Sequence, residues 1–390
     1  MSKRIAILGS TGSIGQNALR VIQALGNDYT VTALTAHSKA DLLAEQTRLF
    51  NPAYIAITNQ DNADKLKNSL PDYNGTILVG PEGLTQIAQL DDIDIVITAV
   101  VGAAGLNAAL AAAQKGKTLA VANKEPLVIA GKLLTETANK SGATILPIDS
   151  EHSAIFQILH GRNPDEVKKI ILTASGGPFR QASPEEIKNA LPKDALAHPT
   201  WNMGPKITVD SATMMNKALE IIEAVWLFNI TTEKIDVLIH PESIVHSLVE
   251  FIDGSIIAQL GTPDMCLPIQ YALTFPKRLK GIAPGLKLDE IKNLTFEKPD
   301  LKTFRAIELG FQVAAQQGST AAVFNAANEA AVRQFLDGKI KFGMIVELIE
   351  HCLNKHQPKA DVNLDELMQA DAWARQQVQE CLNQKVKYVV

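Results

Sequence analysis

The sequence is poor in cysteine and has no excess of positive charge, and each scarcity excludes a class of protein. The 3 cysteines, Cys266, Cys352 and Cys381, are too few and too irregularly spaced for a disulfide framework or a cysteine metal site. This favours a reducing, cytoplasmic location. Lys and Arg number 37 against 42 Asp and Glu, so the net charge is −5 and nucleic acid is not expected as a partner.

Long apolar segments are scarce as well. One stretch, residues 95–113, could be mistaken for a membrane span, but Gly102, Gly105 and Asn107 interrupt it. Its β-branched start and alanine-rich end instead predict a buried strand, a glycine turn and a helix. We therefore expect no membrane span, and the short apolar run that ends at Gly9 is typical of a first strand rather than a signal peptide.

What the sequence does have is an alternation of short apolar runs with helix-length segments over residues 4–149. Strands are predicted at 4–8, 31–35, 54–57, 77–79, 95–98, 118–121 and 144–147. Because such runs must be covered on both faces, they indicate an α/β protein with a Rossmann-like parallel sheet at its N-terminus. A length of 390 residues is too great for one ordinary core and predicts two or three domains.

The pattern changes after Asp149. Strands predicted at 169–173, 237–239, 247–252 and 255–259, with an Asp-Gly turn before the last, indicate a second α/β domain with a mixed sheet. A Pro/Gly/Lys-rich stretch is typical of a linker, and four helices, the last opening on a capping box at Asn363 and Glu366, predict a C-terminal helical bundle. The expected domain boundaries are 1–149, 150–274, a linker at 275–300, and 301–390.

Gly9, Gly12 and Gly15 follow the first predicted strand and open a helix. A tight glycine turn lets backbone N–H groups and the helix N-terminus approach a pyrophosphate, so this position predicts a dinucleotide site. A plain glycine turn is the alternative. The strand before the turn and the helix after it favour the dinucleotide site.

The end of the second strand bears on the choice of nucleotide. NAD-binding proteins usually carry an acidic residue there, which holds the ribose hydroxyls and repels a 2′-phosphate. Here Ala36, His37, Ser38 and Lys39 follow Thr35, and none of them is acidic. This composition favours NADP(H) over NAD(H), although the same residues could be a solvated loop.

Asp149 and Glu151 stand where the last parallel strand ends, the usual ligand edge of such a sheet. Ser150 is placed to cap a helix at 153–160, which leaves the two carboxylates close together at its mouth. Close like charges need a cation, and oxygen donors favour Mg²⁺ or Mn²⁺ over Zn²⁺. In isolation, two such acids would more often be a cap and a surface charge.

A second polar set opens a helix expected at 210–228. Ser211 lies near the expected N-terminus, where anions bind well, and Asn216 and Glu220 share one face beside Lys217. The hydroxyl, the amide and the amine suit a phosphate group, and the carboxylate suits a metal. Without the rest of the pattern, Lys217 and Glu220 would be taken for a surface ion pair.

Two loops extend this predicted site. Ser175 and two glycines follow a strand and offer another place for phosphate oxygens. Residues 198–205, with two prolines, cannot form a long regular element. Trp201 and Met203 within them predict a lid that excludes water when it closes. A packed surface loop is the alternative.

These segments match one family closely. The sequence resembles the 1-deoxy-D-xylulose 5-phosphate reductoisomerases, the bacterial and plastid enzymes of the non-mevalonate isoprenoid pathway. The matching segments are residues 9–15, 122–125, 147–152, 174–179, 198–204, 209–220 and 240–247. They lie in order, with family-like spacing, over most of residues 1–265.

The resemblance implies a homodimer that uses NADPH and Mg²⁺, Mn²⁺ or Co²⁺ on a phosphosugar. It places the metal on Asp149, Glu151 and Glu220, the substrate phosphate on Ser175, Ser211, Asn216 and Lys217, and the substrate backbone on Ser150 and Lys124. It places His152, His198, Trp201, Met203 and His246 along or over the substrate. The expected cofactor residues are Gly9, Ser10, Thr11, Gly12, Ser13, Ile14, Ala36, His37, Ser38, Asn123, Lys124, Glu125 and Gly204.

The implied reaction has two steps, in which Lys124, Asp149, Glu151, His152 and Glu220 would be catalytic. The carbon skeleton rearranges to a branched aldehyde, by retroaldol cleavage and rejoining or by a direct α-ketol shift, and NADPH then reduces the aldehyde to 2-C-methyl-D-erythritol 4-phosphate. The sequence departs from the family pattern at Pro205, where a basic residue is expected, at Glu242, where Gln is common, and at His37 and Ser38, which replace a more basic pair.

Two other functions remain open on the sequence alone. Another NADP-dependent oxidoreductase, such as a semialdehyde dehydrogenase, would need a nucleophilic cysteine, and Cys266 is the candidate in the middle of the chain. A non-catalytic NADP(H)-sensing regulator would need the nucleotide site but not the three carboxylates.

Overall fold

The computed structural model describes residues 2–201 and 203–386. The chain divides into two compact units. The first is built from Met1–Pro126, Leu134–Ser153 and Asp264–Pro284, and the second from Leu127–Leu133, Ala154–Pro263 and Gly285–Val390. The divisions fall inside helices α6 (Glu125–Ser141) and α7 (Ser150–Leu159), so each of these helices contributes residues to both units.

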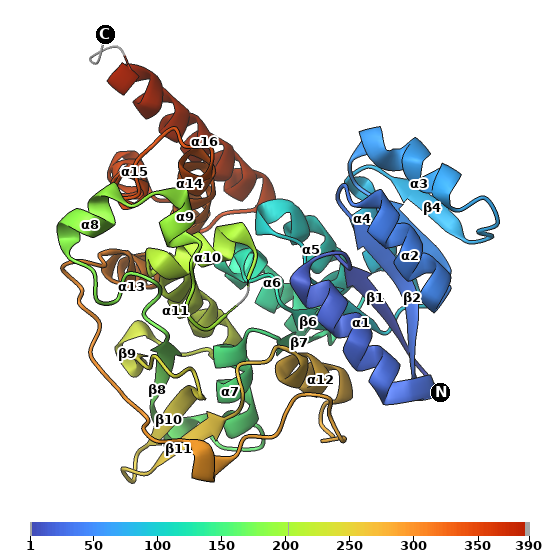
Figure 1. The fold of residues 1–390 in the computed structure, drawn as a ribbon, viewed down its shortest axis with the longest axis horizontal. Helices are drawn as coiled ribbons and strands as arrows, with labels where there is room; N and C mark the ends of the chain where they lie inside the picture. Colours follow the sequence, from blue (N-terminus) through green and yellow to red (C-terminus); the bar gives the residue numbers. More distant parts are fainter. Residues whose placement is uncertain (1, 202, 387–390) are drawn as a thin grey trace. The chain divides into compact units, whose positions relative to one another are not determined.

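The first unit contains a seven-stranded parallel sheet in the order β4-β3-β2-β1-β5-β6-β7 (Figure 1). Its strands are β1 (Lys3–Leu8), β2 (Tyr29–Ala36), β3 (Tyr54–Ile57), β4 (Thr76–Val79), β5 (Ile95–Thr98), β6 (Thr118–Val121) and β7 (Thr144–Pro147). The central strands are buried on both faces, as in β5, where all four residues are buried. This confirms the predicted parallel sheet and each of its strands.

Helices follow the strands of this sheet and cover it. They are α1 (Ser13–Leu25), α2 (Ala40–Phe50), α3 (Ala63–Ser69), α4 (Glu82–Gln89), α5 (Leu106–Gln114) and part of α6. One further helix, α12 (Cys266–Thr274), comes from far along the chain, packs on α1, and receives a hydrogen bond from Lys3 Nζ at the Leu273 carbonyl (3.2 Å).

The second unit contains a four-stranded sheet in the order β11-β10-β8-β9. Its strands are β8 (Val167–Ala174), β9 (Ile235–Ile239), β10 (Val245–Phe251) and β11 (Ile256–Leu260). Strands β8 and β9 are parallel, whereas β10 pairs antiparallel with both β8 and β11. The sheet is therefore mixed, as the sequence predicts.

Most of the second unit is helical. Its helices are most of α7, then α8 (Pro184–Asn189), α9 (Pro192–Ala195), α10 (Pro205–Ala212), α11 (Met215–Phe228), α13 (Ala306–Gln316), α14 (Ser319–Leu336), α15 (Met344–Lys355) and α16 (Leu364–Val386). Helix α14 packs against α15 and α16, and its Phe324 and Phe335 are fully buried, which confirms the helical C-terminal part. At the start of α16, Asn363 and Glu366 exchange the two hydrogen bonds of the predicted capping box.

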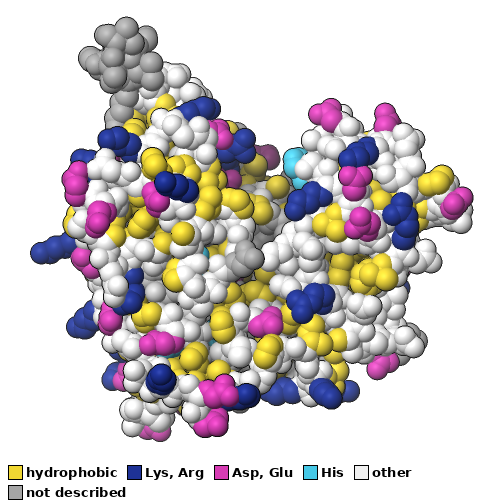
Figure 2. Space-filling view, in the orientation of Figure 1, with side chains coloured by type: hydrophobic (Ala, Val, Ile, Leu, Met, Phe, Trp, Pro, Cys, Tyr) yellow, Lys and Arg dark blue, Asp and Glu magenta, His cyan; other side chains and the backbone are white. Residues whose placement is uncertain are grey.

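The predicted linker, 275–300, holds one short 3₁₀ turn at Leu288–Glu290 and pairs with β9 through a bridge between Ile239 and Glu297. On the face in Figure 2, acidic and basic side chains are interspersed rather than gathered by sign. Among the described residues, no helix is long and apolar enough to span a membrane.

Candidate active site

The glycine turn between β1 and α1 is sterically restricted at two positions. Gly9 has φ +90°, and a Cβ atom there would lie 2.4 Å from the carbonyl oxygen of Ala99. A Cβ atom on Gly15 would lie 2.4 Å from the carbonyl oxygen of Gly9. The N-cap of α1 is Gly12, which has no side chain to accept the first N–H groups of this helix. The turn has the form that accepts a pyrophosphate.

Ser10 serves the turn itself. Its hydroxyl lies 2.6 Å from Gln46 Oε1 and 3.1 Å from the Thr35 carbonyl oxygen, and its backbone N–H donates to the same carbonyl. The hydroxyl is thus engaged in holding the turn against β2 and α2. Thr11 is also buried, and its carbonyl accepts a hydrogen bond from Lys39 Nζ at 3.4 Å.

The end of β2 carries no acidic side chain. The strand ends at Ala36, and the next residues, His37, Ser38 and Lys39, are all exposed. His37 Nδ1 lies 2.8 Å from the hydroxyl of Thr58. A hydroxyl, an imidazole and an amine therefore stand where an NAD-binding protein usually places its carboxylate.

The segment after β6 is buried and hydrogen-bonded. Asn123 donates from Nδ2 to the Gly102 carbonyl (3.2 Å) and to Glu125 Oε2 (2.5 Å). Lys124 is buried and forms an ion pair with Asp149. The carboxyl ends of β6 and β7 thus bring Lys124 and Asp149 together, which the sequence alone did not predict.

Helix α7 begins earlier than the sequence suggests. It starts at Ser150 rather than Ser153, and Asp149 occupies the position before it, where its carbonyl accepts the N–H of Ser153 at 2.8 Å. Ser150 is therefore the first helical residue and not the cap, and its hydroxyl donates to Glu151 Oε2 (2.5 Å). His152, in the same first turn, is fully buried.

The predicted helix at 210–228 is two helices. Met214 adopts a left-handed conformation, with φ +61° and ψ 10°, between α10 and α11. Ser211 consequently lies in the last turn of α10, and the expectation that it stands near a helix N-terminus is wrong. No glycine stands at this break, so the sequence lacks the usual sign of a helix end there.

Asn216, Lys217 and Glu220 lie on one face of α11, as their spacing predicts. Asn216 Nδ2 donates to one oxygen of the Glu220 carboxylate at 2.5 Å, and Lys217 Nζ forms an ion pair with the other. Glu220 is fully buried, so a carboxylate held here requires cationic or hydrogen-bonding partners. The surface ion pair considered from the sequence is therefore a buried one.

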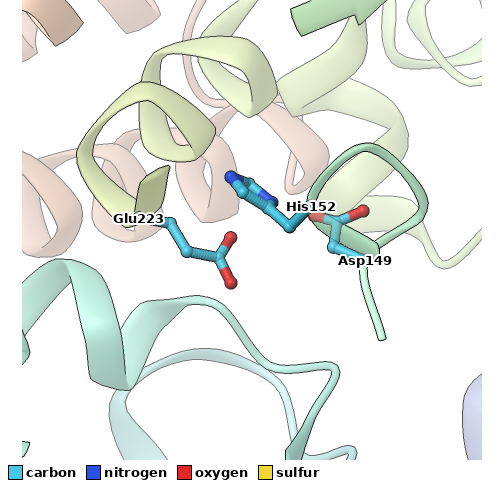
Figure 3. A group of neighbouring side chains, drawn as sticks. All are labelled: Asp149, His152 and Glu223. Carbon is cyan, nitrogen blue, oxygen red and sulfur yellow. The ribbon is translucent and has the colours of Figure 1, made fainter. Parts of the chain in front are cut away.

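In each of two groups of side chains, the atoms that could bind a metal ion all lie within 4.8 Å of one another. One consists of Asp149, Glu151 and Glu220, the predicted oxygen donors, and the other of Asp149, His152 and Glu223 (Figure 3). The sequence analysis did not single out Glu223, although it stands three residues after Glu220, on the same helix face. That spacing could have identified Glu223 as a candidate from the sequence.

Ser175 follows β8 and is joined to the loop at 198–204. The backbone N–H groups of Thr200 and Trp201 donate to His198 Nδ1 (3.2 and 2.9 Å), so the neutral ring carries its proton on Nε2. This Nε2–H donates to the Ser175 hydroxyl at 3.0 Å. The hydroxyl proton of Ser175 thus stays available for an acceptor such as a phosphate oxygen.

The rest of this loop carries Trp201, Met203 and Gly204. Trp201 and Met203 are half-buried, and the Trp201 ring centroid lies 6.4 Å from that of His246, which is buried on β10. Asn202 lies outside the described residues. Gly204 is the N-cap of α10, and Pro205 is the first helical residue, a position that favours proline.

Glu242 faces the linker. Its carboxylate accepts hydrogen bonds from the Thr295 hydroxyl (2.7 Å) and backbone N–H (3.2 Å), and it lies 3.1 Å from His240 Nδ1. These partners lower the pKa of Glu242 against the opposing effect of its partial burial. The extra acid at this position therefore has partners of its own.

Replacing His198 with glutamine should reduce the loss of stability at low pH. Partial burial lowers the pKa of His198, so below about pH 6.5 the unfolded chain binds a proton that the folded chain does not. This contribution to stability is present at higher pH and declines as pH falls toward the folded pKa. Urea midpoints measured at about pH 7.5 and about pH 5.5 should differ more for the wild type than for His198→Gln. Equal differences would contradict this.

Comparison with known proteins decides the family. Residues 5–131 match the model for 1-deoxy-D-xylulose 5-phosphate reductoisomerase, residues 145–228 its C-terminal domain model, and residues 260–377 the DXP reductoisomerase C-terminal domain model. The reductoisomerase of Pelotomaculum thermopropionicum is 49% identical over 96% of this chain and 97% of its own length. The chain belongs to the 1-deoxy-D-xylulose 5-phosphate reductoisomerase family.

Solved structures of reductoisomerases are similar to this structure over nearly the whole chain. The Zymomonas mobilis enzyme in complex with NADPH is 41% identical, with a TM-score of 0.91, covering 98% of this chain and 99% of that one. A reductoisomerase in complex with NADPH, fosmidomycin and magnesium is 42% identical, with a TM-score of 0.93 and 98% of both chains covered.

Proposed function

We propose that this protein is an NADP-dependent oxidoreductase that converts 1-deoxy-D-xylulose 5-phosphate to 2-C-methyl-D-erythritol 4-phosphate in non-mevalonate isoprenoid precursor synthesis. The observation that carries the proposal is the group of three carboxylates, Asp149, Glu151 and Glu220, in a chain that also holds a dinucleotide turn. Family membership over almost the full length supports the same reaction.

The carboxylate group fits a divalent metal. Its donors are all oxygens, and this set favours Mg²⁺ or Mn²⁺, with Co²⁺ also accommodated. We assign Asp149, Glu151 and Glu220 as its ligands, with Lys124 as the cation that balances Asp149. When bound, the metal would polarise the ketone and a neighbouring hydroxyl of the substrate. The reductoisomerase bound to magnesium supports the choice of a hard cation.

The phosphate group of the substrate would be held within the second unit. Ser175 has a free hydroxyl proton because His198 donates to its oxygen, and Asn216 and Lys217 bring an amide and an amine to one face of α11. Ser211, in the last turn of α10, adds a hydroxyl. Trp201, Met203 and His246 would cover the substrate and exclude water.

The nucleotide would bind at the turn from Gly9 to Gly15. Backbone N–H groups of α1 would hold the pyrophosphate, and His37, Ser38 and Lys39 would meet the 2′-phosphate, which favours NADPH. NADPH would supply the hydride for the reduction. The reductoisomerase structures with NADPH support this choice.

Location and assembly belong to the same proposal. The described cysteines are all free, in keeping with a reducing cytoplasm. Strand β11 is at the edge of its sheet and exposes Ile256 and Leu260, which suits pairing with a second copy in a homodimer.

A semialdehyde dehydrogenase mechanism does not suit this chain. Cys266, the candidate nucleophile, is buried, and burial together with the Asp264 carboxylate raises the pKa of its thiol to about 11. Such a thiol is almost wholly protonated near neutral pH and is a poor nucleophile. A non-catalytic regulator, in turn, has no need of the carboxylate group.

Purified protein should oxidise NADPH when given 1-deoxy-D-xylulose 5-phosphate and Mn²⁺, and excess EDTA should abolish the reaction. Absorbance of NADPH measures the rate, and readdition of Mn²⁺ controls for damage by the chelator. Oxidation that persists in EDTA would keep the reductase and discard the metal site. Folded protein with no oxidation under any condition would refute the proposed function.

A further inference from the structure

Helix α10 needs an anchor that its own sequence does not supply. It has eight residues, its N-cap Gly204 has no side chain to accept its first N–H groups, and it ends at the left-handed Met214. Helices this short are marginal without tertiary contacts. Yet α10 carries Ser211, so the position of this helix sets the position of the Ser211 hydroxyl.

The anchor is a buried carboxylate. Asp210, on α10, is 1% exposed, and a buried carboxylate is unfavourable unless it is hydrogen-bonded. Lys206 Nζ lies 2.6 Å from Asp210 Oδ2, but this ion pair lies within α10 and does not join the helix to another element. Asn328 Nδ2, on α14, donates to Asp210 Oδ1 at 3.0 Å. Within residues 2–201 and 203–386, Asn328 is the partner of this carboxylate that comes from another helix.

Helix α14 is a firm support for this contact. Asn328 is fully buried. Glu329, the next residue, pairs with Arg375 of α16 (2.7 Å), and Arg375 also pairs with Asp371 (2.6 Å). This network fixes α14 to α16. The hydrogen bond from Asn328 then fixes α10 to α14.

We propose that Asn328 is a positioning residue for the reaction. Through Asp210 it holds α10, and thereby Ser211, in place for the substrate phosphate. An asparagine suits this task because it gives the carboxylate a second donor without a second buried cation. The catalytic consequence rests on the proposed function, whereas the fixing of α10 does not.

The test compares two asparagines of the same helix. Asn328→Asp keeps the shape but replaces the donor with a carboxylate against Asp210, and Asn325→Ala is the control, since its partner Glu329 lies on α14 itself. Asn328→Asp should raise KM for the phosphosugar roughly tenfold or more and speed amide exchange in residues 205–212. Asn325→Ala should change neither by more than about twofold, even if it lowers the unfolding midpoint.

Rescue separates positioning from general damage. In the double variant Asn328→Asp with Asp210→Asn, position 210 carries the amide donor and position 328 the carboxylate acceptor. The hydrogen bond can therefore form again, and KM and amide exchange in residues 205–212 should return toward the wild type. If Asn328→Asp does not fold, Asn328→Ser, which is too short to reach Asp210, takes its place. Unchanged KM and unchanged exchange in the folded Asn328 variant would overturn the inference, and so would equal effects of the Asn325 control. Wild-type protein without turnover would refute only the function, because amide exchange still tests the anchor.

Discussion

Replacing Glu220 with glutamine is expected to lower kcat by at least about a thousandfold while NADPH binding persists. A metal bound to oxygen ligands contributes several kcal/mol to the stabilisation of developing charge, and about 1.4 kcal/mol corresponds to a tenfold rate. Glutamine keeps an acceptor for Lys217 and Asn216 but removes the charge that would hold the metal. The measurements are steady-state turnover with Mn²⁺ and NADPH titration by fluorescence.

The control for this variant is the same substitution at Glu242, in the same unit. Its carboxylate accepts from Thr295, so Glu242→Gln should keep turnover within about twofold. A thermal transition measured on both variants shows whether each is folded. Near-normal turnover of Glu220→Gln would remove Glu220 from the metal site.

Lys217→Ala is expected to raise KM for 1-deoxy-D-xylulose 5-phosphate by roughly a hundredfold, with a smaller change in kcat. A buried ammonium that contacts phosphate contributes about 2–3 kcal/mol through charge-assisted hydrogen bonds. The same lysine is the cation beside the buried Glu220, so the variant should also be less stable when no metal is added.

A substrate without phosphate isolates this role. With 1-deoxy-D-xylulose, wild type and Lys217→Ala should have similar kcat/KM, because this substrate has no phosphate group for Lys217 to contact. Lys234→Ala, which removes an ammonium that donates to the Val167 carbonyl, is the matched control and should behave as wild type with both substrates. A KM for the phosphosugar that does not change would exclude Lys217 from the phosphate site.

Local signals in the sequence were sufficient for much of the fold. The capping box at Asn363 and Glu366 and the β-branched run of β5 are fixed by neighbours in the chain, so both could be predicted. The order of site segments could be predicted through the family resemblance. The roles of individual site residues stay predictions until the variants are measured.

Other features depend on contacts that a linear pattern does not contain. The break at Met214 uses a left-handed methionine that the packed structure stabilises, so Ser211, expected near the start of one long helix, lies in the last turn of α10. The sequence does not show which residue begins α7 after Asp149. It also does not show the ion pair of Asp149 with Lys124, because the two residues follow different strands that become neighbours only in the folded sheet. The packing of α12 on α1 could not be predicted, because the two helices lie far apart in the sequence.

That placement of α12 has a consequence for synthesis on the ribosome. The parallel sheet is complete once β7 has emerged, but the face of α1 that α12 covers stays bare until residues 266–274 follow. At about 5–20 residues per second, this interval lasts on the order of ten seconds. During that time the nascent chain presents an apolar surface to chaperones, and a chain that stops before α12 would leave the first unit incomplete.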